Sequence, residues 1–418
     1  ELLRQYAAET RARSPAAAEA VHEGHSAYNA PALERWAKDL RGSRQMAALA
    51  EMDVEIDNAR AAWDWTVTQG QVSRLDQALD GLTGYYDWRV RYGEGKTALQ
   101  AAVNRFQAAT GDDLRLLARV LAWQGLITWK SGQPELANQR LEQSLALLED
   151  PLLAGLDTRP ERAFALYCRG YALHDVDREA SKPLCEGSVA LYEALGDRYG
   201  MARALKILGE VISQLGDFAE GRRLVESGLA HARAVGDQQT MAECLQWLSI
   251  VAFFQGQAED SARFSRESAD ICQAIGAPAE LAYSLTMLAG SFILQGQFTE
   301  ARSHALAAVQ AYEEMGLRHA YSAMAQGWLG LIEFLTGDYE KARLEIQSTL
   351  TMAQETNWKR GAGACSLFLG CISLVEGTPE RALKLLEESA SSSQAIKQVD
   401  DYAWARSVMG YAECALGR

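Results

Sequence analysis

The stretch Trp328-Leu-Gly-Leu-Ile-Glu-Phe-Leu-Thr-Gly-Asp-Tyr-Glu-Lys-Ala342 decides the fold of this chain. It joins an apolar segment to a charged one through Gly337, and small residues stand seven positions before that glycine and five after it. Glycine readily takes the left-handed conformation that ends a helix. The stretch therefore predicts two helices joined by a short turn, with Gly330 and Ala342 where the helices cross closely.

The same turn returns at a nearly constant interval. One series of glycines is spaced 40, 40, 41 and 40 residues apart, namely Gly216, Gly256, Gly296, Gly337 and Gly377. A second series, spaced 40 residues apart each time, falls between them, namely Gly196, Gly236, Gly276 and Gly316. A turn about every 20 residues leaves room for one helix between turns. Apolar residues between the turns recur at three- and four-residue steps, which indicates helices.

Small residues recur with the turns. Those before the turn are Gly125, Gly209, Ser249, Ala289, Gly330, Gly370 and Gly410. Those after it are Ala137, Ser261, Ala301, Ala342 and Ala382. Over roughly residues 114–418 this pattern resembles the tetratricopeptide repeat (TPR), although the period is 40 rather than 34. Tryptophans two residues before the small position (Trp123, Trp247, Trp328) make the variant similar to the long-repeat superhelices of bacterial signal-transduction ATPases of the maltose-activator type.

We therefore expect an all-α fold, a right-handed α-solenoid of TPR-like helical hairpins with a period of about 40 residues. Residues 111–418 would form this superhelix, with an orphan first helix at 400–418. Its seven expected repeats are 114–150, 159–197, 199–237, 239–277, 279–317, 320–357 and 360–397. Residues 1–110 are expected to form a helical linker or arm.

A second resemblance lies in Glu51-Met-Asp-Val-Glu-Ile-Asp-Asn-Ala-Arg-Ala-Ala-Trp-Asp-Trp65. It resembles the segment that follows the nucleotide-binding and winged-helix domains in bacterial regulators of the STAND type. Residues 85–95 fit the same family as the opening of the next hairpin, and residues 2–6 as the tail of a missing winged helix. Because the chain starts at Glu1 without methionine, we expect it to be a fragment. The resemblance implies that this fragment is the C-terminal sensor, with the ATPase and effector upstream.

Composition limits the kinds of partner. The formal charge of −14, from 41 basic and 55 acidic residues, repels phosphate backbones, so nucleic-acid binding is not expected. No apolar run approaches the ~20 residues needed to cross a bilayer, and no signal peptide is visible. The seven cysteines fit small core residues in a reducing compartment. We expect a cytoplasmic location without membrane contact.

Catalytic and metal-binding patterns are incomplete. Gly93-Glu-Gly-Lys-Thr97 ends like a phosphate-binding loop, but Val90 stands where a glycine is required and no strand precedes it, so a helical turn is expected. His22 and His25 have no evident third ligand, and no nucleophile motif appears. We expect no catalytic residue, metal or cofactor in this chain. The STAND resemblance implies ATP and Mg²⁺ only in the missing upstream domain.

The TPR resemblance implies which side chains face a concave groove. They stand three residues before and one after the small position of each first helix, with further outer positions. Through the second to fourth repeats these positions carry tyrosine and charged residues, a composition typical of recognition surfaces, although an ordinary solvated face is the alternative. The expected binding residues are Tyr167, Tyr171, Arg203, Lys206, Glu210, Glu243, Gln246 and Tyr283.

Three functions follow from this interpretation. The first is a sensor, in which a protein or peptide trigger in the groove controls the upstream ATPase and winged-helix domains of the same chain. The second is a passive scaffold for protein–protein interaction, or for self-association through residues 400–418. The third is a small-molecule sensor inside the superhelix, which a closed pocket would favour.

Overall fold

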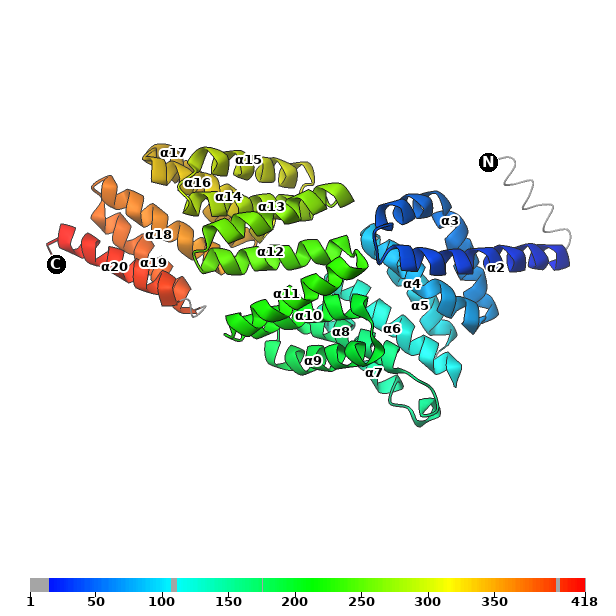
Figure 1. Ribbon diagram of the computed structural model, residues 1–418. Coiled ribbons are helices and arrows are strands. Elements are labelled where there is room, and N and C mark those ends of the chain that lie inside the picture. The colour runs from blue at the N-terminus through cyan, green and yellow to red at the C-terminus, as the bar shows by residue number, and fades with distance from the viewer. Residues whose placement is uncertain (1–14, 107–110, 175, 396–398, 418) are drawn as a thin grey trace. The chain divides into compact units, whose positions relative to one another are not determined.

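The computed structural model describes residues 15–106, 111–174, 176–395 and 399–417, and every regular element in these ranges is helical (Figure 1). The predicted all-α class is therefore confirmed. Two compact units, residues 1–244 and 245–418, are described separately, and their border falls inside helix α12 (Gln238–Phe254). The expected winged-helix tail, residues 2–6, lies outside the described residues, and the expected boundary between 110 and 111 stays a prediction.

Unit 1 begins with four helices that pack as a bundle, followed by three helical pairs. The bundle helices are α2 (Pro15–Asp39), α3 (Gln45–Gln69), α4 (Val72–Trp88) and α5 (Tyr92–Arg105). The pairs are α6 (Asp112–Lys130) with α7 (Pro134–Leu147), α8 (Arg159–Leu173) with α9 (Arg178–Leu195), and α10 (Arg198–Gln214) with α11 (Phe218–Val235). A 3₁₀ turn, η1 (Pro151–Leu153), lies in the loop between α7 and α8.

Unit 2 continues the alternation of helix and turn. Its helices after α12 are α13 (Ala258–Ile275), α14 (Pro278–Leu294), α15 (Phe298–Glu314), α16 (Ala320–Thr336), α17 (Tyr339–Glu355), α18 (Lys359–Val375), α19 (Pro379–Ala395) and α20 (Val399–Ala415). Consecutive helices pack together, and α14, α16, α18 and α20 also contact one another in order. This stacking of hairpins is that of a TPR-like solenoid. Among the described helices, none is both long and apolar enough to span a membrane.

The four-helix bundle depends on one close approach and on buried tryptophan. A Cβ atom on Gly81 of α4 would lie 2.1 Å from the carbonyl oxygen of Leu33, so α2 and α4 can meet there only at a glycine. Trp63 is fully buried, and its Nε1 donates to the carbonyl oxygen of Ala98 in α5 at 3.2 Å. The tryptophan-rich stretch 51–65 thus joins α3 to α5.

Residues 85–95 differ from the expected start of a hairpin. They end α4 and begin α5, with residues 89–91 between the two helices. The stretch Gly93–Thr97 lies in the first turns of α5 rather than in the connecting turn itself. Gly95 is buried there, and a Cβ atom on it would contact Ile127 and Tyr86 at 3.1 and 3.2 Å. Packing against these side chains therefore explains the glycine without a phosphate.

The recurring turns are built from the residues that predicted them. Gly337 has φ 87°, a left-handed conformation, and its N–H donates to the carbonyl oxygen of Phe334 at 3.2 Å to end α16. The side chain of Asp338 accepts from the backbone N–H of Lys341 at 3.2 Å and caps α17. A Gly-Asp pair thereby ends one helix and begins the next within two residues.

Each small residue sits where the two helices of a pair cross. A Cβ atom on Gly209 would lie 2.6 Å from Cγ2 of Val225 and 2.7 Å from the carbonyl oxygen of Gly221. Gly330 shows the same closeness, with Cγ1 of Ile346 at 2.7 Å. Gly410 stands at the matching place in α20 and has no atom within 4 Å of a built Cβ. The small position is therefore required by the crossing and not by the helix.

Gly209→Ala should lower the free energy of unfolding by about 1–3 kcal/mol, because a backbone oxygen cannot yield as a flexible side chain does. The matched control is Gly410→Ala, where the added methyl group meets open space and alanine favours the helix by up to about 1 kcal/mol. Urea unfolding followed by circular dichroism measures both. Equal destabilisation by the two variants would contradict the crossing role of Gly209.

Glu333 is the buried acid that joins three helices of unit 2. Its side chain, on α16, pairs with Arg302 of α15 and lies 2.6 Å from Nζ of Lys341 in α17. Only 5% of the Glu333 side chain is exposed. Hydrogen bonding to Arg302 is the main cause that lowers the pKa of Glu333 to about 2, with Lys341 contributing.

The lowered pKa of Glu333 predicts acid sensitivity. Because the ionised form is favoured in the folded state, its contribution is complete above the unfolded pKa of about 4.5 and is lost as the pH falls toward 2. The stability difference between wild type and Glu333→Gln should therefore shrink by roughly 3 kcal/mol between pH 6 and pH 2. Glu340→Gln, which removes an exposed carboxylate from α17, controls for net charge. A difference that does not change with pH would contradict the account.

Candidate functional site

The structure divides the predicted binding residues between the two units. Unit 1 holds Tyr167 and Tyr171 on α8, Arg203, Lys206 and Glu210 on α10, and Glu243 on α12. Unit 2 holds Gln246, on the rest of α12, and Tyr283, on α14.

Aromatic side chains form a row along one face of α8. Phe164, Tyr167, Tyr171 and His174 follow at steps of three and four residues, so they share that face. Neighbouring ring centroids in this row lie 6.4, 6.1 and 5.2 Å apart. Rings from α6 cover two of its members, with Trp123 at 4.7 Å from Phe164 and Trp129 at 4.7 Å from Tyr171. The two predicted tyrosines thus belong to a larger aromatic row that packs in the core of unit 1, where only 6% of Tyr167 is exposed and Tyr171 is partly buried.

Arg203 of α10 reaches into this row. Its guanidinium carbon lies 4.5 Å from the ring centroid of Tyr167 and 5.4 Å from that of Tyr199, distances typical of cation–π contact. One guanidinium nitrogen donates to the hydroxyl of Tyr199 at 3.4 Å. No carboxylate of the described residues forms an ion pair with Arg203. The nearest groups to its charge are therefore aromatic rings, and the carboxylate of Asp237, which accepts from Thr240, acts on the guanidinium electrostatically without an ion pair.

Lys206, Glu210 and Glu243 satisfy one another instead. Nζ of Lys206 lies 3.1 Å from Glu210 and 3.5 Å from Glu243. Burial alone would lower the pKa of Lys206, but these two carboxylates outweigh it and raise the pKa well above its usual range. Only 12% of the lysine side chain and 10% of Glu210 are exposed, so this group is a buried contact that joins α10 to α12, and its predicted role in binding stays a prediction.

A cavity of about 310 Å³ lies beside Tyr167 and Arg203, and we call it the unit 1 cavity. Its walls come from the end of α2 and the turn after it, and from α4, α6, α8, α9, α10 and the first residues of α12. Besides these two side chains, its polar lining includes Arg41, Asp80, Asp87, Arg119, Glu161 and Asp197. Tyr171, Lys206, Glu210 and Glu243 do not line it.

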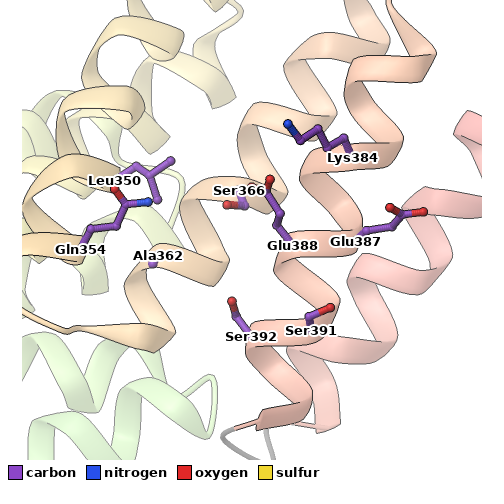
Figure 2. Close-up of a pocket in the computed structure, with 9 residues that line it drawn as sticks. All are labelled: Leu350, Gln354, Ala362, Ser366, Lys384, Glu387, Glu388, Ser391 and Ser392. Atoms are coloured by element: carbon purple, nitrogen blue, oxygen red, sulfur yellow. The ribbon is translucent and has the colours of Figure 1, made fainter.

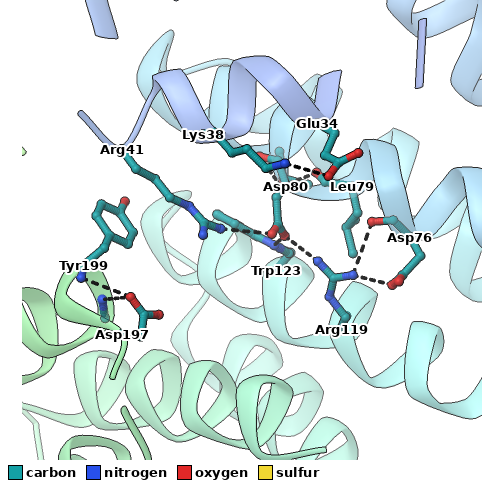
Figure 3. Close-up of polar contacts among 12 residues, drawn as sticks. Glu34, Lys38, Arg41, Asp76, Leu79, Asp80, Arg119, Trp123, Asp197 and Tyr199 are labelled. Carbon is teal, nitrogen blue, oxygen red and sulfur yellow. Dashed lines mark hydrogen bonds and ion pairs between the residues drawn. The ribbon is translucent and has the colours of Figure 1, made fainter. Parts of the chain in front are cut away.

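Asp80 is the centre of the ionic network at this cavity (Figure 3). It accepts from Arg119 at 2.9 Å, from Arg41 at 3.0 Å and from Nε1 of Trp123 at 2.9 Å. Burial alone would raise the pKa of Asp80, but the two guanidinium groups outweigh it and lower the pKa below its usual value. Arg119 also pairs with Asp76, one turn earlier on α4. The carboxylate is therefore held ionised and fixed.

Arg41 brings the turn between α2 and α3 to the far side of the cavity. Its guanidinium carbon lies 5.2 Å from the ring centroid of Tyr199 in α10. The same turn approaches the end of α11, because a Cβ atom on Gly42 would lie 3.3 Å from the carbonyl oxygen of Val235. The N-terminal bundle and the third helical pair of unit 1 thus meet across the cavity.

The sequence analysis missed Arg41, Asp80 and Arg119. A signal for two of them exists, since Asp76 and Asp80 lie four residues apart, as do Arg115 and Arg119. Residues at that spacing share one helix face, and the two pairs carry opposite charge. The position of Arg41 has no comparable signal, because it depends on a contact between distant turns.

Unit 2 shows a different arrangement. Gln246 donates to the carbonyl oxygen of Glu280 at 3.0 Å and to the hydroxyl of Ser284 at 3.1 Å, so it joins α12 to α14. The ring of Tyr283 lies 4.6 Å from that of Tyr321. An open groove of about 580 Å³ runs between α17, α18 and α19 (Figure 2), and no predicted residue lines it. Its charged lining is Lys384, Glu387 and Glu388.

Metal ligands do not gather in the part of the chain that the structure describes. Nowhere in it do three or more His, Cys, Asp or Glu side chains lie close enough together to hold a metal ion. Five of the seven cysteines are buried, Cys371 is partly buried and Cys414 is exposed, and none of these thiols is in a disulfide.

The fold is similar to that of solved TPR proteins. One is a Signal Transduction ATPase with Numerous Domains (STAND) from Pyrococcus horikoshii that carries a tetratricopeptide repeat sensor, with a TM-score of 0.61 and 15% identity over 86% of this chain and 53% of that one. Another is a Rap protein complexed with competence and sporulation factor, with a TM-score of 0.53 and 13% identity over 87% of this chain and 98% of that one.

These likenesses show the fold, a TPR-like helical repeat. The chain spans about half the length of the STAND protein that it matches. No protein-family model and no curated protein matches the sequence.

Asp80→Asn should lower the free energy of unfolding by about 2–4 kcal/mol, because it leaves the guanidinium groups of Arg119 and Arg41 with too little opposing charge. The matched control is Glu34→Gln, which breaks the exposed pair with Lys38 (2.9 Å; 72% and 42% exposed) and should cost less than about 0.5 kcal/mol. Urea unfolding gives both values. A loss for Asp80→Asn no larger than for Glu34→Gln would contradict the role of Asp80.

Proposed function

We propose that this chain is the sensor module of a larger STAND-type signal-transduction ATPase, and that it binds a protein or peptide trigger without catalysis of its own. The observation that carries the proposal is the unit 1 cavity, where Tyr167 and Arg203 come together from different helical pairs. Aromatic and arginine side chains dominate binding energy at recognition surfaces. The similarity to the TPR sensor of the STAND protein supports the same role.

Binding at the cavity would act on the N-terminal bundle through Arg41. This side chain joins the turn between α2 and α3 to Asp80 and to the ring of Tyr199. A trigger that contacts Arg41 or Tyr199 competes with these contacts, and so favours a different placement of the turn. A ligand shifts such an equilibrium only by its differential affinity for the two states. The bundle lies on the side of the sequence where the ATPase and winged-helix domains are expected.

A second candidate is a scaffold for self-association. Three large aromatic side chains of α20 are exposed, Tyr402 by 36%, Trp404 by 49% and Tyr411 by 73%. Aromatic residues are enriched where proteins associate, so this face of α20 fits a contact surface. The two candidates place the binding energy in different units, and variants can therefore separate them.

The test is selection of displayed peptides on the whole chain, followed by calorimetric titration of each recovered peptide. Tyr167→Leu keeps an apolar side chain but removes the aromatic ring from the cavity wall, and should weaken binding at least about tenfold, as for an interface anchor. Tyr411→Leu, an exposed aromatic of α20, is the matched control and should leave the affinity unchanged.

The opposite result would be weaker peptide binding in Tyr411→Leu and unchanged binding in Tyr167→Leu. It would overturn the sensor proposal and favour the scaffold. A molar mass that rises with protein concentration for the wild type, but not for Tyr411→Leu, would also favour the scaffold. The proposal that an ATPase and a winged-helix domain precede this chain is tested by sequencing the parent gene. It should encode a P-loop ATPase and a winged helix before Glu1, and an unrelated domain there would contradict it.

A further inference from the structure

Arg203 differs from the other charged groups at the unit 1 cavity in how its charge is held. Its guanidinium lies against the rings of Tyr167 and Tyr199, and its one hydrogen-bond partner among the described residues is the Tyr199 hydroxyl. A guanidinium has five N–H donors, so most of its hydrogen-bonding capacity is left. The side chain lines the cavity, so a ligand inside can reach those donors.

The acids of the cavity do not compete for Arg203. Its lining includes four carboxylates, and each accepts at least one hydrogen bond from another residue, although Oε2 of Glu161 is buried without a partner. Asp80 accepts from Arg41, Arg119 and Trp123. Asp87 accepts from Lys130, and Glu161 accepts from Arg115. Asp197 accepts from the backbone N–H groups of Tyr199 and Gly200. Lys130 lies 2.6 Å from Asp87, and Arg115 lies 2.7 Å from Glu161. Among the described residues, Arg203 is therefore the cation of this lining that forms no ion pair, with Asp237 outside the lining acting on it electrostatically.

The geometry favours one class of anion. A planar guanidinium binds a carboxylate through two parallel hydrogen bonds, and the flanking rings keep the Arg203 plane in place. Phosphate is less suitable, because its second charge would be repelled by the four carboxylates of the lining. Phe164 and Trp123 beside Tyr167 supply apolar surface for the rest of the ligand. A volume of about 310 Å³ suits a small ligand or one terminal residue of a longer one.

We propose that the unit 1 cavity binds the carboxylate of a ligand at Arg203, with an aromatic or bulky apolar group of the same ligand against Phe164 and Trp123. This deepens the proposed function, since it names the chemical group that a trigger would present. The carboxylate could belong to a free small acid or to the end of a peptide, and both present the same chemistry to Arg203.

The probes are N-acetyl-L-phenylalanine and its amide, which have nearly the same shape but differ in charge. Calorimetric titration or protein NMR of the whole chain should show binding of the acid, and binding at least about tenfold weaker for the amide. Arg203→Met should weaken binding of the acid by a similar factor, and Arg203→Lys should weaken it by less. Arg263→Met is the matched control, since Arg263 lies over the Phe264 ring at 4.3 Å in unit 2.

Three outcomes would overturn the proposal: equal affinity for acid and amide, undiminished affinity in Arg203→Met, or no binding of the acid at about 10 mM. Inorganic phosphate binding as tightly as the acid would overturn the carboxylate preference. If Arg203→Met fails to fold, the ratio of the wild-type affinities for the acid and for its amide decides whether the carboxylate is recognised.

The source of the carboxylate is separated by two further probes. Phenylacetate binding as tightly as N-acetyl-L-phenylalanine supports a free acid, and tighter binding of Gly-Gly-Phe than of its C-terminal amide supports a peptide end. A positive result with these acids stands even if no trigger peptide is ever selected, so failure of the proposed function is distinguishable from failure of this site.

Discussion

The close crossing of two helices at a small residue is the constraint on which the rest of this structure depends. At Gly209 the backbone of α11 comes so near that a single methyl group would collide with a carbonyl oxygen. Such a crossing fixes which faces of the two helices meet, and thereby which side chains of the first helix are left to face away from the pair. In α10 those side chains include Arg203, and in α8 they include Tyr167.

Charge balance then decides what the unit 1 cavity can do. Asp76 and Asp80 of α4 meet Arg115 and Arg119 of α6, so the two helices neutralise each other along one face. Buried charges of this kind need partners, and here nearly all have them. Arg203 is an exception, because its guanidinium lies against aromatic rings and forms no ion pair, while Asp237 acts on it only electrostatically. The cavity thus keeps hydrogen-bond donors of Arg203 for a ligand.

Much of the fold could be predicted from the sequence, because the spacing of glycines indicates the turns and the small residues indicate where two helices cross closely. The positions of Gly209 and Gly337 carry that information within a few residues of each site. The cavity was less predictable. Periodicity indicates that Lys206 and Glu210 share a face, but not that Glu243 of another helix would also pair with Lys206. Nor does it reveal that Arg41 would contact Tyr199, since two distant turns must meet for that.

The most direct test is a double-mutant cycle between Tyr167→Leu and Arg203→Met, with the free energy of unfolding measured for each variant and for both together. The account predicts a favourable coupling of about 0.5–2 kcal/mol, as expected for a guanidinium held over a ring away from water. A coupling near zero for this pair, with a strong coupling of Arg203 to a carboxylate such as Asp237, would contradict it. The guanidinium would then be an ordinary ion-pair partner with nothing left to offer a ligand.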